Sequence, residues 1–148
     1  MLIKISVLTF IISLGFFGQV LSQETVPQYQ TKNFQEAQNQ VQITISDQIA
    51  AFGSFDIERA YFHASSSIKA IFPDSKIFGE MVKRSYPMIW NPKSYEFIST
   101  SSGSAGILQR VMFKDQKDTM HFFDYVLENN GKRWVISGVY MVQGEKGV

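Results

Sequence analysis

The 148-residue sequence contains no cysteine, so it can form neither a disulfide nor a metal site built on thiolates. Its two separated histidines provide too few ligands for a metal site built on imidazole. Basic and acidic residues nearly balance, at 14 and 13, so no strongly basic surface for nucleic acid is expected. The folded domain must therefore be stabilised by its apolar core alone.

The sequence also lacks the glycine motifs that bind phosphate groups. It has no P-loop, no dinucleotide-binding glycine pattern and no nucleophile elbow. The glycines of SSGSAG, residues 101–106, do not lie between a strand and a helix, as such motifs require. We therefore expect no cofactor, and the residues alone disclose no reaction.

The first 22 residues have the layout of a secretory signal peptide. Lys4 precedes an apolar run from Ile5 to Phe17, and Val20 and Ser22 occupy the positions that signal peptidase recognises. An uncleaved membrane anchor is the alternative, but polar residues and glycines dilute the run below the roughly 20 apolar residues that span a bilayer. The sequence predicts a secreted, periplasmic protein that contacts the membrane only through this segment, before cleavage.

The remaining chain divides into a short tether and one domain. Residues 23–34 are rich in polar side chains and have almost nothing to bury, which predicts a flexible polar tether. Residues 35–148 form the single domain, which is long enough to bury a core of its own. Aromatic residues make up 14% of the chain, so aromatic rings should dominate that core.

An apolar stripe at helical spacing predicts the first helix. Its members recur every three or four residues and are Val41, Ile45, Ile49 and Phe52. Gly53 follows, and glycine enters the left-handed conformation that ends a helix without steric cost. Asp56 is then expected to cap a second helix that ends near His63.

A third helix follows a short helical segment that ends at Pro73. Asp74 or Ser75 is expected to cap it, and two cations in its last turn complement the helix dipole. Pro87 is expected to prevent further helix, and Pro92 favours an extended chain before it. The segment between the two prolines is therefore interpreted as a corner between helix and sheet.

Beyond this corner the apolar residues recur with a period of two, which predicts antiparallel strands. Four strands are expected, at residues 93–99, 105–114, 119–128 and 133–142. Asn130 and Gly131 favour a two-residue turn that pairs Asn129 with Lys132. The fold class is then α+β, with N-terminal helices packed on a strongly curved antiparallel sheet of four or more strands.

The pairing at this hairpin assigns side chains to the two faces of the sheet. Tyr125 and Tyr140 fall on one face, and Asp124 and Val139 fall on the other. Both faces are mainly apolar, whereas a sheet with one wet face should alternate apolar and polar residues. Since helices cover only one face, we expect a second copy of the chain to cover the other in a homodimer.

Four segments of the sequence resemble a known bacterial family, the domain of unknown function DUF4864. They are QIAAFGSFDIERAYFHAS, FGEMVKRSYPMIWNP, LQRVMF and FDYVLENNGKRWVISGVYMV, between about Ile45 and Val142. The resemblance implies a cone-shaped fold of the nuclear-transport-factor-2-like (cystatin-like, SnoaL-like) kind, often paired through the sheet, and it implies no reaction. In two departures from the family pattern, Ser66 replaces a proline and Asp118 replaces a glycine.

Five residues are candidates for binding a ligand: Tyr86, Trp90, Gln109, His121 and Tyr125. At the corner, the rings of Tyr86 and Trp90 either line a small apolar pocket or fill the core. Gln109 lies beside Asp124 or beside Tyr125, because a one-residue change of register exchanges the two arrangements. The alternative role of Gln109 is to fix that register through hydrogen bonds.

The favoured function is a secreted, non-enzymatic domain that binds a small apolar ligand or an envelope protein and self-associates through its sheet. The alternative is a lyase or isomerase of the SnoaL-like kind, with His121 or Asp124 as general base. Alternation along a strand places these two residues on opposite faces, so no acid–base pair is assembled. His63 is interpreted as a hydrogen-bonded structural residue, and a purely structural interaction module is the third possibility.

Overall fold

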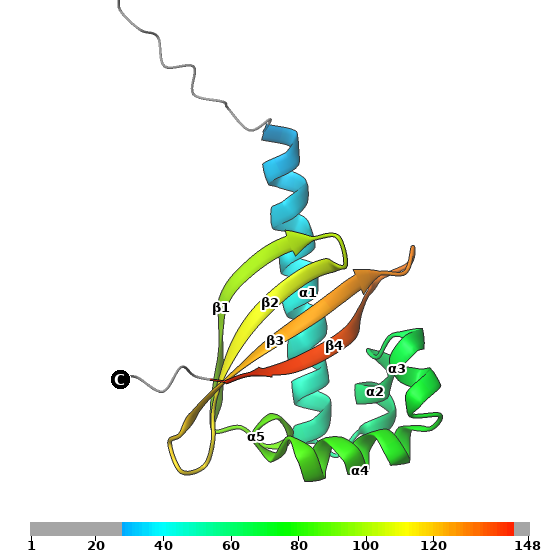
Figure 1. The fold of residues 1–148 in the computed structure, drawn as a ribbon, viewed down its shortest axis with the longest axis vertical. Helices are drawn as coiled ribbons and strands as arrows, with labels where there is room; N and C mark the ends of the chain where they lie inside the picture. The colour runs from blue at the N-terminus through cyan, green and yellow to red at the C-terminus, as the bar shows by residue number, and fades with distance from the viewer. Residues whose placement is uncertain (1–27, 144–148) are drawn as a thin grey trace, which may run out of the picture.

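The computed structural model describes residues 28–143, which form helices packed on one face of a four-stranded antiparallel sheet (Figure 1). This arrangement confirms the predicted α+β fold class. Helix α1 runs along the sheet, and four shorter helices gather near its C-terminal end. The helices are α1 (Gln28–Gly53), α2 (Ile57–Phe62), α3 (Ser66–Ile71), α4 (Ser75–Ser85) and α5 (Pro87–Trp90). The predicted signal peptide, residues 1–22, lies outside the described residues.

Helix α1 begins earlier than the sequence predicts. Residues 28–34, expected in the polar tether of residues 23–34, form its first two turns. Glutamine and lysine have good helix propensity, so a polar segment can extend a helix that is anchored further along. The anchor is the predicted stripe, in which Val41, Ile45, Ile49 and Phe52 are all buried. Residues 23–27 lie outside the described part of the chain.

At the C-terminal end of α1, the residue with the left-handed conformation is not the predicted one. The helix ends at Gly53, but the left-handed residue is Phe55, with a φ of 59°. The N–H of Asp56 donates to the carbonyl of Ala51 (2.9 Å) and closes the helix end around Phe55. The expectation that Gly53 adopts the left-handed conformation is therefore wrong.

The capping residues predicted for two later helices are confirmed. The carboxylate of Asp56 accepts the N–H of Arg59 (3.1 Å), and the carboxylate of Asp74 accepts that of Ile77 (2.8 Å). Pro87 does not prevent further helix but begins α5. Proline is well tolerated at a first helical position, because the N–H that it lacks would have no partner there.

The four strands follow one another in space as they do in sequence, and every neighbouring pair is antiparallel. They are β1 (Ser94–Gly103), β2 (Gly106–Lys114), β3 (Met120–Asn129) and β4 (Trp134–Val142). All four predicted strands are present, with ends within a few residues of the expected ones. Helix α1 packs against β2 and β4, so the inner face of the open sheet is the one that the helices cover.

The β3–β4 hairpin has a longer loop than the predicted two-residue turn. Asn129 pairs with Trp134 rather than with Lys132, which leaves residues 130–133 in the loop. The side-chain oxygen of Asn130 accepts two backbone N–H groups within this loop, at 3.1 and 3.0 Å. These hydrogen bonds stabilise a wider turn, so the asparagine acts through its side chain rather than through a left-handed backbone.

A bulge at Ser137 changes which face of the sheet the later side chains of β4 occupy. Side chains alternate along a strand, so one extra residue moves each following side chain from the inner to the outer face or the reverse. Val139 therefore packs against the core, and Tyr140 lies on the outer face opposite Asp124. The predicted grouping of Tyr140 with Tyr125, and of Val139 with Asp124, is wrong for this reason.

The loop between α2 and α3 is bound to the outer edge of β4. The N–H of Ile136 donates to the carbonyl of His63 (2.8 Å), and its carbonyl accepts the N–H of Ser65 (2.8 Å). Ala64 and Ile136 form a parallel bridge between these two bonds. The helical layer is thus attached to the sheet by backbone hydrogen bonds as well as by apolar contact.

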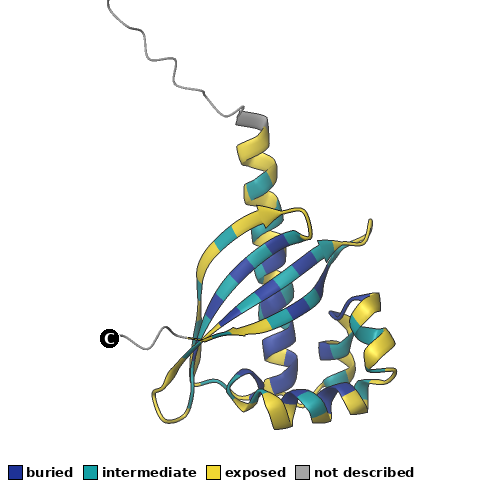
Figure 2. Cartoon of the chain, in the orientation of Figure 1, coloured by how far each residue is buried: buried dark blue, intermediate teal, exposed yellow. Residues whose placement is uncertain are grey.

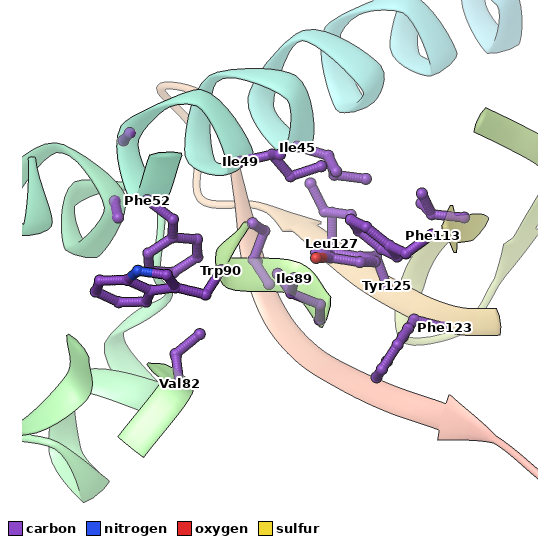
Figure 3. Close-up of a cluster of buried hydrophobic side chains, with 14 of the residues drawn as sticks. Ile45, Ile49, Phe52, Val82, Ile89, Trp90, Phe113, Phe123, Tyr125 and Leu127 are labelled. Atoms are coloured by element: carbon purple, nitrogen blue, oxygen red, sulfur yellow. The ribbon is translucent and has the colours of Figure 1, made fainter. Parts of the chain in front are cut away.

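The core lies between α1 and the inner face of the sheet. Buried residues alternate with partly exposed ones along β2 and β3 (Figure 2). Figure 3 shows the buried rings of Phe52 and Trp90 on the helical side and those of Phe113, Phe123 and Tyr125 on the strands. Burying one large apolar side chain stabilises a fold by about 1.5–3 kcal/mol.

We predict that Gly106→Ala lowers the free energy of unfolding by about 3 kcal/mol, because the strand backbones must separate. Gly106 has a φ of 124°, and a Cβ at this position would lie 2.0 Å from the carbonyl oxygen of Leu127. Gly103→Ala is the matched control in the same hairpin, since its Cβ would have no neighbour within 4 Å. Urea denaturation measures both variants, and equal losses would contradict the prediction.

Candidate functional site

A cavity of about 210 Å³ lies between the inner face of the sheet and the helices. Its walls come from α1, α3, α4, α5, β3 and β4, and they are almost wholly apolar. The lining residues are Gln48, Phe52, Ile68, Phe72, Phe78, Met81, Val82, Tyr86, Ile89, Tyr125, Ile136 and Val139.

Tyr125 brings a buried hydroxyl to this cavity from the middle of β3. Its side chain is fully buried, yet the hydroxyl has no hydrogen-bond partner among the described residues. Figure 3 shows the hydroxyl oxygen pointing away from the strand on the side of Ile89. Burial raises the pKa of Tyr125 above its ordinary value, so the group remains a neutral donor. A buried polar group without a partner costs about 1–3 kcal/mol.

Gln48 supplies the second polar group of the cavity, from α1. Its Nε2 donates to the carbonyl of Ala60 (3.1 Å), which fixes the orientation of the amide. Its Oε1 is a hydrogen-bond acceptor. Gln48 is not among the residues predicted from the sequence, although a signal exists: it lies between Ile45 and Phe52 on the apolar stripe, where a polar residue is unusual.

The cavity is not completely enclosed. Five of its lining residues are only half-buried, whereas the other seven are buried; the five are Ile68, Phe72, Met81, Tyr86 and Val139. The hydroxyl of Tyr61 donates to the carbonyl of Phe72 (2.6 Å) and so anchors the end of α3. No Asp, Glu, Lys, Arg or His among the described residues lines the cavity. Its chemistry is that of neutral hydrogen-bonding groups in an apolar wall.

Two of the five predicted ligand-binding residues, Tyr86 and Tyr125, line this cavity. The half-buried ring of Tyr86 packs edge-on against Phe123, with centroids 5.9 Å apart. Trp90 lies elsewhere, in the core beside Phe52, with ring centroids 5.3 Å apart. The Trp90 ring belongs to the core cluster and also borders a separate surface groove with Phe55 and Lys83.

Gln109 is fully buried but has a hydrogen bond for each of its polar atoms. Of the two registers left open by the sequence, the structure has the one that pairs Gln109 with Tyr125. The Oε1 of Gln109 accepts from the hydroxyl of Thr100 (2.6 Å) and from Nε2 of Gln42 (3.2 Å). Its Nε2 donates to the carbonyl of Ser99 (2.9 Å). The amide links α1, β1 and β2, and it lies outside the cavity.

His121 and Asp124, the candidate bases, are both bound to other side chains. The Nε2 of His121 lies 2.9 Å from a carboxylate oxygen of Asp115, beside the β2–β3 turn. Asp124 accepts two hydrogen bonds from Arg110, each of 2.8 Å, on the outer face of the sheet. Neither residue lines the cavity.

A polar cluster that the sequence did not predict joins α1 to α2. The carboxylate of Asp47 lies 2.6 Å from Nε2 of His63 and accepts a 3.0 Å bond from Nε of Arg59. The bond from Arg59 and the contact with His63 lower the pKa of Asp47 to about 2, although burial opposes this shift. The His63 side chain is buried, so the cluster is a structural link between the helices.

A family model matches residues 34–147, and its description is a domain of unknown function, DUF4864. The chain belongs to this family. The match confirms the resemblance seen in the sequence, and it covers all of the sheet and helices except the first turns of α1. The family description names no activity, and neither a curated protein nor a solved structure matches the chain.

Residues 28–143 bring no three His, Asp or Glu side chains together in a way that could hold a metal ion. Within the same range, none of the helices is both long and apolar enough to span a membrane. Surface charges in this range form pairs such as Lys93 with Asp118 (2.7 Å).

Asp47 gives a prediction for the dependence of stability on pH. Because its pKa is lowered from 3.8 to about 2 in the folded state, the unfolded chain takes up the proton first as the pH falls. The stabilisation is complete above about pH 4 and is lost as the pH falls towards 2. We predict that Asp47→Asn is less stable than the wild type near neutral pH, and that this difference shrinks between about pH 4 and pH 2.

The midpoint of urea unfolding, measured across this pH range, checks the prediction. Asp74→Asn is a suitable control, because asparagine is also a good N-cap and Asp74 forms no ion pair among the described residues. The two variants should differ in how their urea midpoints change between about pH 4 and pH 2. A destabilisation by Asp47→Asn that is the same at neutral and at low pH would contradict the assignment.

Proposed function

We propose that the protein binds a small, uncharged and mainly apolar molecule in the cavity, with a hydrogen-bond acceptor placed against the hydroxyl of Tyr125. The observation that carries this proposal is the fully buried hydroxyl that has no partner among the described residues. Buried polar groups are almost always hydrogen-bonded, so a ligand acceptor would complete the site. The amide of Gln48, which also lines the cavity, offers a second polar contact to the ligand.

The size and the lining of the cavity support a small and neutral ligand. Ligand pockets usually enclose about 300–1,000 Å³, and this cavity of about 210 Å³ is smaller. A charged ligand would be buried without a counter-ion, which is strongly unfavourable. A ketone, ester or ether with one ring or a short branched chain has the chemistry that the walls favour.

A binding role has more support than catalysis. A general base must come within about 3 Å of the proton that it removes, whereas His121 and Asp124 are bound to Asp115 and Arg110 outside the cavity. A lyase or isomerase would need one of these residues to face the bound molecule. The polar groups of the cavity, Tyr125 and Gln48, suit orientation of a ligand rather than proton transfer.

Acetophenone and ethylbenzene test the role of Tyr125, because they have similar shapes and only the ketone has an acceptor. We predict that the wild type binds acetophenone about fivefold more tightly, the value of one net hydrogen bond, and that Tyr125→Phe removes the preference. The thermal midpoint of Tyr125→Phe should not fall, because the variant loses a buried hydroxyl that has no partner. Titrations followed by the methyl NMR signals of Met81 and Ile89 report binding in the cavity.

Tyr140→Phe is the matched control, since it removes a hydroxyl from the outer face and should leave the preference unchanged. Binding of neither compound would contradict the proposed site. A preference for the ketone that survives Tyr125→Phe would contradict the proposed role of the hydroxyl.

We propose further that the protein acts in the periplasm as a homodimer. The signal-like composition of residues 1–22 supports export. The outer face of the sheet supports self-association, because Met120, Phe122 and Tyr140 are exposed there by 61%, 37% and 61%. The Arg110–Asp124 pair lies on the same face. The hydrogen bonds between the two side chains would reduce the free-energy cost of burying their charges in the dimer interface.

We predict that Phe122→Glu converts a dimer into a monomer, because a carboxylate would be buried without a partner in the interface. Sedimentation velocity of the purified protein measures the change. Ile43→Glu is the control, since Ile43 is 67% exposed on α1, away from the sheet face. A wild type that sediments as a monomer at every concentration would contradict self-association.

A further inference from the structure

Helix α3 contributes to the cavity wall without being buried itself. None of its six residues, Ser66–Ile71, is buried. Ile68 and Phe72, the residue that follows the helix, line the cavity and are half-buried, whereas Ile71 is 70% exposed to solvent. A helix of this length is also too short to be stable on its own. The position of α3 therefore depends on the contacts that attach it to the rest of the domain.

The two ends of α3 are attached in different ways. Before the helix, the N–H of Ser65 donates to the carbonyl of Ile136 (2.8 Å), which joins this end to the backbone of β4. After the helix, the hydroxyl of Tyr61 donates to the carbonyl of Phe72 (2.6 Å). The ring of Phe72 also contacts that of Phe78, with centroids 6.2 Å apart. The first end is thus fixed to the sheet, and the second end is held by side-chain contacts.

Tyr61 is itself held in place, so its hydroxyl is a fixed point of attachment for α3. Its ring packs against Phe78 with centroids 5.5 Å apart. The ammonium of Lys69 lies 5.0 Å from the centre of the same ring. Tyr61 is not among the residues that line the cavity. A substitution at Tyr61 therefore changes the attachment of α3 without changing the surface that a bound molecule would contact.

We propose that residues 66–72 form a lid over the cavity, which swings about the attachment of Ser65 to Ile136 and is held closed by the hydrogen bond from Tyr61. This inference rests on the proposed binding of a ligand in the cavity, and it adds how that ligand enters. In the closed lid, Ile68 and Phe72 contact the ligand, so binding stabilises closure. Segments with few buried side chains open at a lower free energy than the core, as the lids of binding sites do.

Hydrogen exchange of backbone amides tests the lid without any ligand. The N–H of Lys69 is bonded to the carbonyl of Ser65 (3.0 Å), and that of Phe72 is bonded to the carbonyl of Ile68 (2.9 Å). Once detached, so short a helix unfolds and exposes both amides. We expect their protection factors to be at least tenfold lower than that of the Ser65 amide, which stays bonded to β4. Tyr61→Phe should lower them about fivefold further, the value of one net hydrogen bond.

Ile45→Val is the matched control, because it removes one buried methylene from α1 and destabilises the domain by a similar amount. It should accelerate only the amides that exchange through global unfolding, and it should leave those of Lys69 and Phe72 unchanged. An equal response of these two amides to Ile45→Val and to Tyr61→Phe would show that α3 opens only when the whole domain unfolds. That result would overturn the lid.

Acetophenone, bound in the cavity, tests whether the lid controls access. Saturation with acetophenone should slow exchange of the Phe72 amide, because the ligand stabilises the closed lid. Tyr61→Phe should raise the rates of association and dissociation about fivefold each and leave the dissociation constant unchanged. The reason is that the hydrogen bond from Tyr61 is present in the closed lid both with and without the ligand. NMR relaxation dispersion of the Met81 methyl signal measures the two rates.

The ligand experiment separates the lid from the binding site. If Tyr61→Phe accelerates exchange of the α3 amides but leaves the ligand rates unchanged, the ligand enters elsewhere and the lid is overturned. If acetophenone does not bind at all, the proposed function is contradicted. The protection factors of the ligand-free protein then still decide whether α3 opens locally.

Discussion

The burial of one face of the sheet beneath α1 is the contact on which the rest of the structure depends. Val111, Phe113, Phe123 and Leu127 on the strands are fully inaccessible to solvent, as is Ile45 on the helix. Each such side chain contributes about 1.5–3 kcal/mol, whereas an exposed ion pair contributes about 1 kcal/mol or less. The shorter helices pack around the C-terminal end of α1. The cavity is the space between these helices and the sheet that their side chains do not fill.

Gln109 and Tyr125 show how differently two neighbouring buried polar residues can be used. They face each other across β2 and β3, and both are fully buried. The amide is saturated by Thr100, Gln42 and Ser99, so it specifies how α1 and β1 are positioned. The phenol has no partner among the described residues, so its capacity for hydrogen bonding is unused.

The sequence predicts the parts of this fold that depend on local chemistry. The caps Asp56 and Asp74 are correct, and Asp118, where the family pattern has a glycine, does adopt a left-handed φ of 65°. The bulge at Ser137 was not predictable, because apolar residues occupy both parities of β4 around it. The cavity depends on how side-chain volumes from six elements fill a shared space, and no local pattern reports that.

The attachment of Ile136 to the loop between α2 and α3 also limits how two molecules can aggregate. Both backbone groups of Ile136 on the outward side of β4 are already bonded, so an added strand could not run along the full length of that edge. The opposite edge, β1, is interrupted by a bulge near Ile98, which twists the strand away from a flat pairing geometry. Both edge strands of the open sheet are therefore protected from pairing with another chain, although the sheet does not close into a barrel.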